Sequence, residues 1–226
     1  MAAAALLAPE PVWSFTPDGT VIDIATPDQR VVCFNEMANS LSKIARFDGR
    51  NPGQPYSVAQ HSVLGACAIL NEGGSTHEAA LYFLHDGHEY ITGDQSSPIQ
   101  KLYALVARHL FGEDRFRDTI AACKAAWDEV IYYAAGLPGP EAWTKRQAAL
   151  VKSMDERMCR AEALALFGPK AASQFANMKP PTLPNPIRPW APMEAEFRFR
   201  EMAAKLLTEG RVMNQAIVAA NRRGAH

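Results

Sequence analysis

Two ionisable side chains stand next to each other at the end of an apolar segment. His85 and Asp86 directly follow Phe83 and Leu84, which we expect to be buried. Burying an imidazole and a carboxylate is costly unless something compensates them, and a divalent cation would do so. Imidazole and carboxylate ligands suit Mn, Fe, Co, Ni or Zn better than copper(I), which prefers sulfur. His-Asp dipeptides also occur by chance, so the pair indicates a metal site only together with further ligands.

Further ligands could come from other helices, since the metal sites of helical bundles draw ligands from several facing helices. His61 lies in the preceding apolar segment, and Asp155 lies in a later segment with helical periodicity. Taken alone, each of these two residues also has an explanation that involves no metal. A single histidine is more often a hydrogen-bonded core or surface residue, and Asp155 would pair with Lys152 or Arg157 on a helix face. The prediction therefore depends on the combination.

Helical periodicity dominates the chain from residue 34 onward. Ser57 and Ser75 are expected helix caps, and Ser75 with Glu78 forms a capping-box pattern. A proline-rich connector over residues 179–192 cannot be regular helix. We expect helices over 34–47, from 57, over 98–110, 115–135, 141–167 and 193–207, and from 75, this last one with His85, Asp86, His88 and Glu89 near its end.

The expected fold class is all-α, a helical bundle with a small N-terminal extension or hairpin. Residues 13–32 contain short β-prone runs separated by turn signals such as Pro17-Asp18-Gly19. We expect an extension over residues 1–33, one helical domain over 34–210 and a C-terminal tail over 211–226.

The composition of the chain limits which kinds of partner molecule we expect. Twenty-three Lys and Arg residues against 24 Asp and Glu give a net charge of -1, so we expect no nucleic-acid polymer as a partner. The four cysteines form no CxxC pair, and the N-terminal segment lacks the basic start of a signal peptide. No stretch stays apolar for the roughly 20 residues that a membrane helix needs. A cytoplasmic protein without a membrane partner is expected.

Three segments together resemble the HD superfamily of metal-dependent phosphohydrolases. They are RFDGRN with YSVAQHSV, LHDGHEYITGDQSSP, and VKSMDERM, and they span the region from about residue 44 to 167. The similarity is strongest to the branch of 5'-deoxynucleotidases and related phage-type nucleotide hydrolases. It implies an HD-domain bundle that binds a divalent ion (Co, Mn, Zn, Ni or Fe) through His61, His85, Asp86 and Asp155.

The resemblance also implies two catalytic acids. Glu89 occupies the place of a carboxylate one turn after the HD pair, where it could orient a water molecule or move its proton. Asp94, in the Thr92-Gly93-Asp94 turn, matches a second family acid. Without the surrounding motif, Glu89 would be a surface residue near a helix end, and Asp94 would cap a turn. For His88, between these groups, we expect a solvent-exposed side chain, and the alternative is a residue that supports the metal ligands or relays a proton.

Substrate-binding residues are implied in the same way. Arg46 aligns with an arginine that binds the substrate phosphate, a task that suits a guanidinium fork; alone, it would be a surface arginine at a helix end. Phe47 stands where the deoxynucleotidase branch has Trp next to the sugar. Gln100 stands where relatives often have Lys, so the neighbouring Lys101 is the candidate cation.

The leading functional hypothesis is a 5'-(deoxy)nucleotidase that converts nucleoside monophosphates into nucleoside and phosphate. A deoxynucleoside triphosphate triphosphohydrolase is the enzymatic alternative, and it requires more cations at the mouth of the site. Lys43, Arg50, Lys101 and Arg108 are available for that purpose. A noncatalytic nucleotide-binding HD protein is a third alternative. The small-molecule nucleotide is the expected partner, and a homodimer or larger homo-oligomer is also expected from the resemblance.

Overall fold

The segment that follows Ser57 forms the central helix of the protein. In the computed structural model, which describes residues 6–113 and 115–223, α2 (Val58–Asn71) is buried along almost its whole length, including Gln60, His61 and Ser62. The Ser57 hydroxyl accepts a hydrogen bond from the Gln60 N–H and caps the helix as expected. A helix that is buried on all sides can present polar groups to an internal site.

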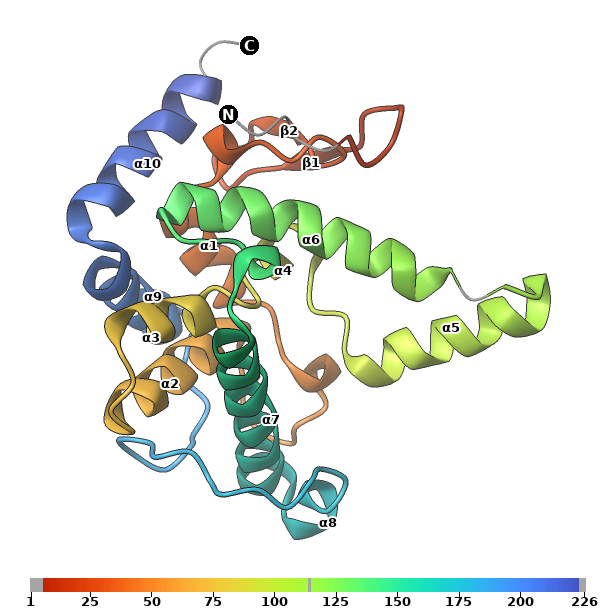
Figure 1. Cartoon of the computed structure of the whole chain (residues 1–226), viewed down its shortest axis with the longest axis vertical. Helices are drawn as coiled ribbons and strands as arrows, with labels where there is room; N and C mark the ends of the chain where they lie inside the picture. The colour runs from red at the N-terminus through yellow and green to blue at the C-terminus, as the bar shows by residue number, and fades with distance from the viewer. Residues whose placement is uncertain (1–5, 114, 224–226) are drawn as a thin grey trace.

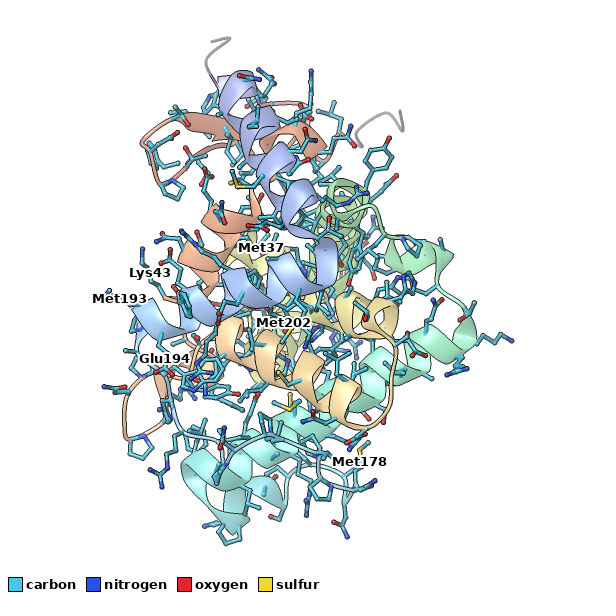
Figure 2. The ribbon with its side chains drawn as sticks, turned by 90° about the vertical axis from the view of Figure 1, so that its left-hand side faces the viewer. Met37, Lys43, Met178, Met193, Glu194 and Met202 are labelled. Atoms are coloured by element: carbon cyan, nitrogen blue, oxygen red, sulfur yellow. The ribbon has the colours of Figure 1, made fainter. Side chains whose placement is uncertain are left out.

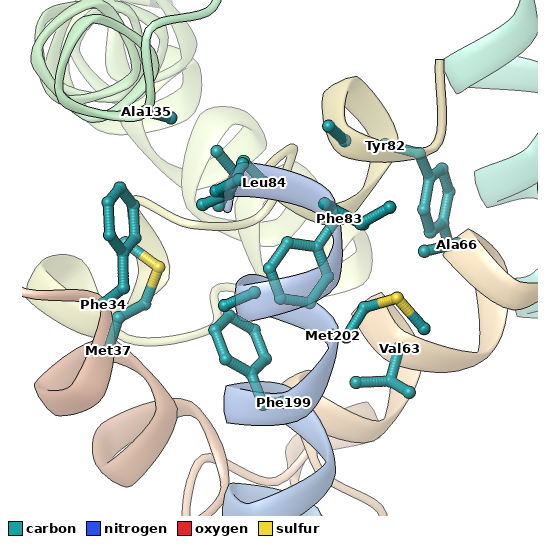
Figure 3. Close-up of a cluster of buried hydrophobic side chains, with 14 of the residues drawn as sticks. Phe34, Met37, Val63, Ala66, Tyr82, Phe83, Leu84, Ala135, Phe199 and Met202 are labelled. Atoms are coloured by element: carbon teal, nitrogen blue, oxygen red, sulfur yellow. The ribbon is translucent and has the colours of Figure 1, made fainter. Parts of the chain in front are cut away.

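Three helices pack around α2 and form the core. They are α3 (Thr76–Phe83), α7 (Lys145–Phe167) and α9 (Pro192–Leu207). Phe83 of α3 and Phe199 of α9 face each other with ring centroids 4.3 Å apart (Figure 3). Figure 2 shows α9 lying across α2 and α3, with Met202 at the crossing.

The remaining elements surround this core. The short hairpin pairs β1 (Trp13–Phe15) with antiparallel β2 (Val21–Asp23), and Trp13 lies opposite Asp23. The expectation of a mostly helical fold with a small N-terminal hairpin is therefore confirmed. The other elements are η1 (Gln29–Val31), α1 (Phe34–Leu41), η2 (Phe47–Gly49), α4 (Glu89–Thr92), α5 (Ser97–Phe111), α6 (Phe116–Ala135), η3 (Pro140–Ala142), α8 (Pro169–Ala172) and α10 (Glu209–Arg223).

The helices α5 and α6 form a hairpin that projects from the rest of the molecule (Figure 1). Pro98 lies in the first turn of α5, and Gly112 ends this helix in the left-handed conformation, as the sequence predicts. At the other end of the hairpin, the C-terminal half of α6 enters the core through Trp127 and Ile131. Among the described residues, no helix is both long and apolar enough to cross a membrane.

Four expected boundaries are wrong, and one of them is the start of α7, which lies at Lys145 and not at residue 141. The first helix ends at Leu41, because the chain then turns to extended backbone and the Arg46 N–H donates to the Tyr56 carbonyl. The helix before the HD pair ends at Phe83, so His85 and Asp86 lie in the following turns. Residues expected to form a C-terminal tail form α10 instead.

Helix α10 exists because its residues present one face to the body of the protein. Val212, Gln215 and Ala219 are spaced three and four residues apart, and all three are buried. The Gln215 amide donates to the carbonyls of Gln29 and Val32, which holds α10 against η1 and the start of α1. Residues 224–226 of the expected tail lie outside the described residues.

Candidate metal centre and cleft

The four predicted metal ligands converge from three parts of the chain. His61 comes from α2, His85 and Asp86 from the turn after α3, and Asp155 from α7. The two Nε2 atoms are 3.4 Å apart, and Asp86 Oδ2 lies 3.2 Å from Nε2 of His85 and 3.7 Å from Nε2 of His61. The Asp155 Oδ1 atom lies 3.3 Å and 3.7 Å from Nε2 of His61 and His85.

In each histidine, the hydrogen bond made by Nδ1 determines that Nε2 is the nitrogen that can bind a metal. Nδ1 of His85 lies 2.6 Å from the Tyr82 carbonyl oxygen, and Nδ1 of His61 lies 2.7 Å from Oε1 of Glu162. Carbonyl and carboxylate oxygens can only accept, so each Nδ1 carries a proton. Both histidines therefore present Nε2 to the centre, and the same arrangement orients metal-binding histidines in general.

Glu162 is a component of the site that the sequence interpretation missed. Its carboxylate is fully buried and accepts from the Tyr56 hydroxyl at 2.9 Å, from His61 Nδ1, and from Arg46 Nε at 3.2 Å. A usable signal was present, because Glu162 follows Asp155 by two helical turns and lies on the same face as buried Met158.

The local electrostatics favour positive charge at this centre. Burial alone would lower the pKa of His85, but Asp86 and Asp155 raise it to about 10. Burial would raise the pKa of Asp155, but its contacts with the two imidazoles hold that pKa well below the ordinary value. The contacts that stabilise imidazolium here would equally stabilise a cation.

The donor set fits a divalent transition ion. His61, His85 and Asp86 each place one donor atom within 4.8 Å of the others, and Asp155 Oδ1 lies beside both imidazoles. Two imidazole nitrogens and two carboxylates suit Mn, Fe, Co, Ni or Zn and lack the sulfur ligands of copper(I) sites. These residues therefore form a candidate metal centre.

A cleft of about 930 Å³ opens onto this centre. Its polar lining includes Asp86 and Asp155, both predicted acids Glu89 and Asp94, and Arg46. A cavity of this volume is in the range of small-molecule sites. The lining also includes apolar, polar and basic side chains from other segments: Ile24, Phe47, Arg50, His88, Gln100, Arg117, Ile120, Cys123, Lys124 and Phe167.

Glu89 begins α4 and is almost completely buried, with 8% of its surface exposed. Its Oε2 atom has no hydrogen-bond partner among the described residues. Burial raises the pKa of Glu89 well above its ordinary value, and the charges of Asp86 and Asp94 add to this effect. Burial likewise raises the pKa of Asp94. A carboxyl group in this position can hold and exchange a proton.

Arg46 lies at the centre rather than on the surface. Its guanidinium contacts Asp86 Oδ2 at 3.3 Å, Glu162 Oε2 at 3.2 Å and Cys159 Sγ at 3.1 Å. The arginine is buried, and these contacts hold it beside the ligand carboxylates. It lines the cleft, where it can contribute positive charge towards an anionic ligand.

The other two predicted substrate-binding residues differ in their positions. Phe47 lines the cleft and contacts Phe167 edge-on, with ring centroids 5.4 Å apart. Its φ of 55° is a left-handed conformation that is costly for an aromatic residue. Lys101 is exposed on α5 and is not part of the cleft lining, whereas Gln100 is.

The expectation that His88 is exposed to solvent is wrong. His88 has only 7% of its surface exposed, and its Nδ1 lies 3.0 Å from Oδ1 of buried Asp128 on α6. The physical reason is that a buried carboxylate needs a donor, and the imidazole supplies it.

Comparison with known proteins adds one partial relative. No protein-family model matches the sequence. A protein of Rhodobacter capsulatus, described as uncharacterized, is 31% identical over 91 residues, which cover 39% of this chain and 46% of that protein. The match thus spans about half the length of the relative. This similarity names no activity, so the function must be argued from the candidate metal centre and its cleft.

Proposed function

We propose that this protein is a metal-dependent phosphohydrolase of the HD type that acts as a 5'-(deoxy)nucleotidase. The observation that carries the proposal is the convergence of His61, His85, Asp86 and Asp155 at the end of a cleft that also contains the unpaired carboxyl oxygen of Glu89. The resemblance to HD phosphohydrolases supports the same reaction class.

In this proposal the four ligands, Glu89 and Arg46 each have a defined task. A divalent ion held by the four ligands supplies Lewis acidity towards water and phosphate oxygens. Glu89 accepts a proton from the attacking water, for which its buried and unpaired oxygen is suited. Arg46 balances negative charge on the phosphate. The water oxygen bonds to phosphorus as the P–O5' bond breaks, and the leaving O5' takes up one proton, so the products are a nucleoside with a free hydroxyl group and orthophosphate.

A triphosphohydrolase is the second candidate, and one observation favours it. Arg50, Arg117 and Lys124 line the cleft in addition to Arg46 and could neutralise a longer phosphate chain. Of the four cations expected from the sequence for this purpose, only Arg50 is part of the lining. Release of intact tripolyphosphate from deoxynucleoside triphosphates would select this reaction, and release of orthophosphate from monophosphates would select the leading one.

A metal-by-substrate screen with identification of products tests the proposal. The protein is assayed with Mn, Co, Ni, Zn and Fe against nucleoside mono-, di- and triphosphates. We expect metal-dependent release of orthophosphate from the monophosphates. Absence of turnover under all these conditions would contradict an enzymatic role and favour a noncatalytic nucleotide-binding protein.

Substitutions connect the activity to the site. His85→Ala and Asp86→Ala should each abolish both bound metal and turnover. Glu89→Gln should retain the metal and lose at least about 100-fold in kcat. His109→Ala, which changes an exposed histidine on α5, is the matched control and should behave like the wild type. Wild-type turnover in Glu89→Gln would remove this residue from the mechanism.

A further inference from the structure

His88 lines the same cleft, is paired with buried Asp128, and has no part in the reaction described above. Asp128 is 2% exposed, and the only hydrogen bond of its carboxylate among the described residues comes from His88. His88 contributes to the cleft lining, next to the catalytic candidate Glu89. A buried histidine–carboxylate pair at a ligand cavity suggests a role in binding.

The backbone around His88 leaves the imidazole little freedom. A side chain on Gly87 would come within 2.9 Å of the Leu84 carbonyl oxygen and would also contact Ile131, so the turn is closely packed on the core. The His88 carbonyl accepts from the Ile91 and Thr92 N–H groups. With the backbone fixed and Nδ1 held by Asp128, the orientation of the ring is fixed as well.

The free ring nitrogen is therefore the group that His88 offers to a ligand. Nε2 of His88 has no hydrogen-bond partner in the described part of the chain, whereas Nδ1 is bound to Asp128. Ile24, Ile120 and Cys123 line the same cleft and provide apolar surroundings. Because the carboxylate of Asp128 contacts the ring and Glu89 follows His88 directly in the chain, a neutral polar group fits this position better than a phosphate.

We propose that His88, positioned by Asp128, binds a sugar hydroxyl group of the substrate. A hydroxyl group both donates and accepts, so it can bond to Nε2 whether or not that nitrogen carries a proton. The inference builds on the proposed nucleotidase function and extends it to specificity. In a 2'-deoxynucleoside 5'-monophosphate the free sugar hydroxyl is the 3'-hydroxyl, so this is the group that His88 selects.

Paired substrates that differ only in this hydroxyl test the inference. Affinity for 2'-deoxynucleoside and 2',3'-dideoxynucleoside 5'-monophosphates is measured by calorimetry on metal-depleted protein, and kcat and KM on metal-loaded protein. The wild type should favour the 3'-hydroxyl by about 10- to 100-fold, since a site built for a hydroxyl rejects an analogue that lacks it. In His88→Phe the two ligands should differ by no more than about twofold.

Further variants separate a binding role from a purely structural one. Asp128→Asn should reduce the preference for the ligand with the 3'-hydroxyl, because the amide no longer holds the ring through a charged acceptor. His88→Gln retains a polar side chain and should keep part of the discrimination. His109→Phe is the control and should keep all of it. Each ratio compares two ligands on one variant, so partial unfolding of a variant does not alter it.

The outcomes distinguish this inference from the proposed function. Nucleotide hydrolysis by the wild type without preference for the 3'-hydroxyl overturns the role of His88 and leaves the nucleotidase function standing. Binding with the expected preference but without turnover under any metal overturns the nucleotidase function and supports His88 as a hydroxyl-binding residue. If neither nucleotide binds to the metal-depleted protein and neither is hydrolysed by the metal-loaded protein, both proposals are overturned.

Discussion

At the scale of single residues, the two histidines of the candidate centre depend on acceptors behind them. His61 is held by the buried carboxylate of Glu162, and His85 by the backbone carbonyl of Tyr82. The first of these acceptors can be changed by mutation and the second cannot. Glu162 also binds Tyr56 and Arg46, so it links the ligand set to the guanidinium group.

Glu162→Gln should weaken metal binding without removing a ligand. The neutral amide is a weaker acceptor than the carboxylate and must turn its NH2 group either towards Arg46 or towards Tyr56 and His61, so the His61 ring is held less firmly. We expect a 10- to 100-fold loss of affinity for Mn²⁺ by calorimetry, as for other residues that orient metal ligands. Glu156→Gln, on the exposed face of α7, is the control. Unchanged affinity in Glu162→Gln would show that His61 needs no such acceptor.

Motif residues were predictable from the sequence, while their supporting residues were not. The convergence of His61, His85, Asp86 and Asp155 agrees with the ligand set expected from the resemblance. The helical spacing of Asp155, Met158 and Glu162 indicates that Glu162 faces inward, but it does not show that Glu162 meets His61, 101 residues away. Likewise, no local pattern places His88 against Asp128, 40 residues further along the chain.

At the scale of elements, the site depends on a close approach between α2 and α3. Gly65 of α2 lies directly against the ring of Tyr82 on α3, leaving no space for a side chain. The Tyr82 hydroxyl in turn lies 2.9 Å from Nε2 of His61. The spacing of the two helices therefore sets the position of a side chain at the candidate metal centre.

Gly65→Ala should affect both stability and the site. The added methyl group would overlap the Tyr82 ring, and overpacking of this kind costs about 1–3 kcal/mol in the free energy of unfolding. We expect this loss in urea denaturation, together with weaker metal binding. Gly53→Ala is the control, because a methyl group there meets nothing within 4 Å. If the double variant Gly65→Ala/Tyr82→Leu regains part of the lost free energy of unfolding, the overlap with the Tyr82 ring is the cause. A Gly65→Ala variant as stable as the wild type would contradict the close packing.

Local capping signals explain which element boundaries could be predicted. Ser75 and Glu78 form the expected capping box at the start of α3. Thr144 and Gln147 form another, which begins α7 at Lys145 rather than at residue 141. The end of α1 had no such signal, because it depends on the pairing of the following segment with residues 56 and 57.

At the scale of the whole molecule, a proline-rich connector crosses between distant helices. It leads from α8 to α9 and contains no regular helix, as the sequence predicts. Arg157 of α7 donates to the carbonyls of Lys179 and Pro180 in this connector and to the carboxylate of Glu72 at the end of α2. Glu72 also accepts from the Thr182 N–H. One ion pair thus joins two core helices and the connector.

Protonation of Glu72 should weaken this junction in acid. Hydrogen bonding by Arg157 lowers the pKa of Glu72 from the ordinary value of 4.5 to about 2, so the folded protein binds the proton less readily than the unfolded chain. The contribution to stability is therefore complete above about pH 4.5 and is lost as the pH falls towards 2.

Glu72→Gln should remove this part of the pH dependence. In urea denaturation the variant should be less stable than the wild type at pH 6, and the difference should shrink as the pH falls from 4.5 to 2.5. Glu201→Gln, at an exposed position of α9, should show no such convergence. The comparison isolates Glu72 because all other carboxylates are the same in both proteins. A constant difference between wild type and Glu72→Gln across this range would show that Glu72 is not the acid-sensitive partner of Arg157.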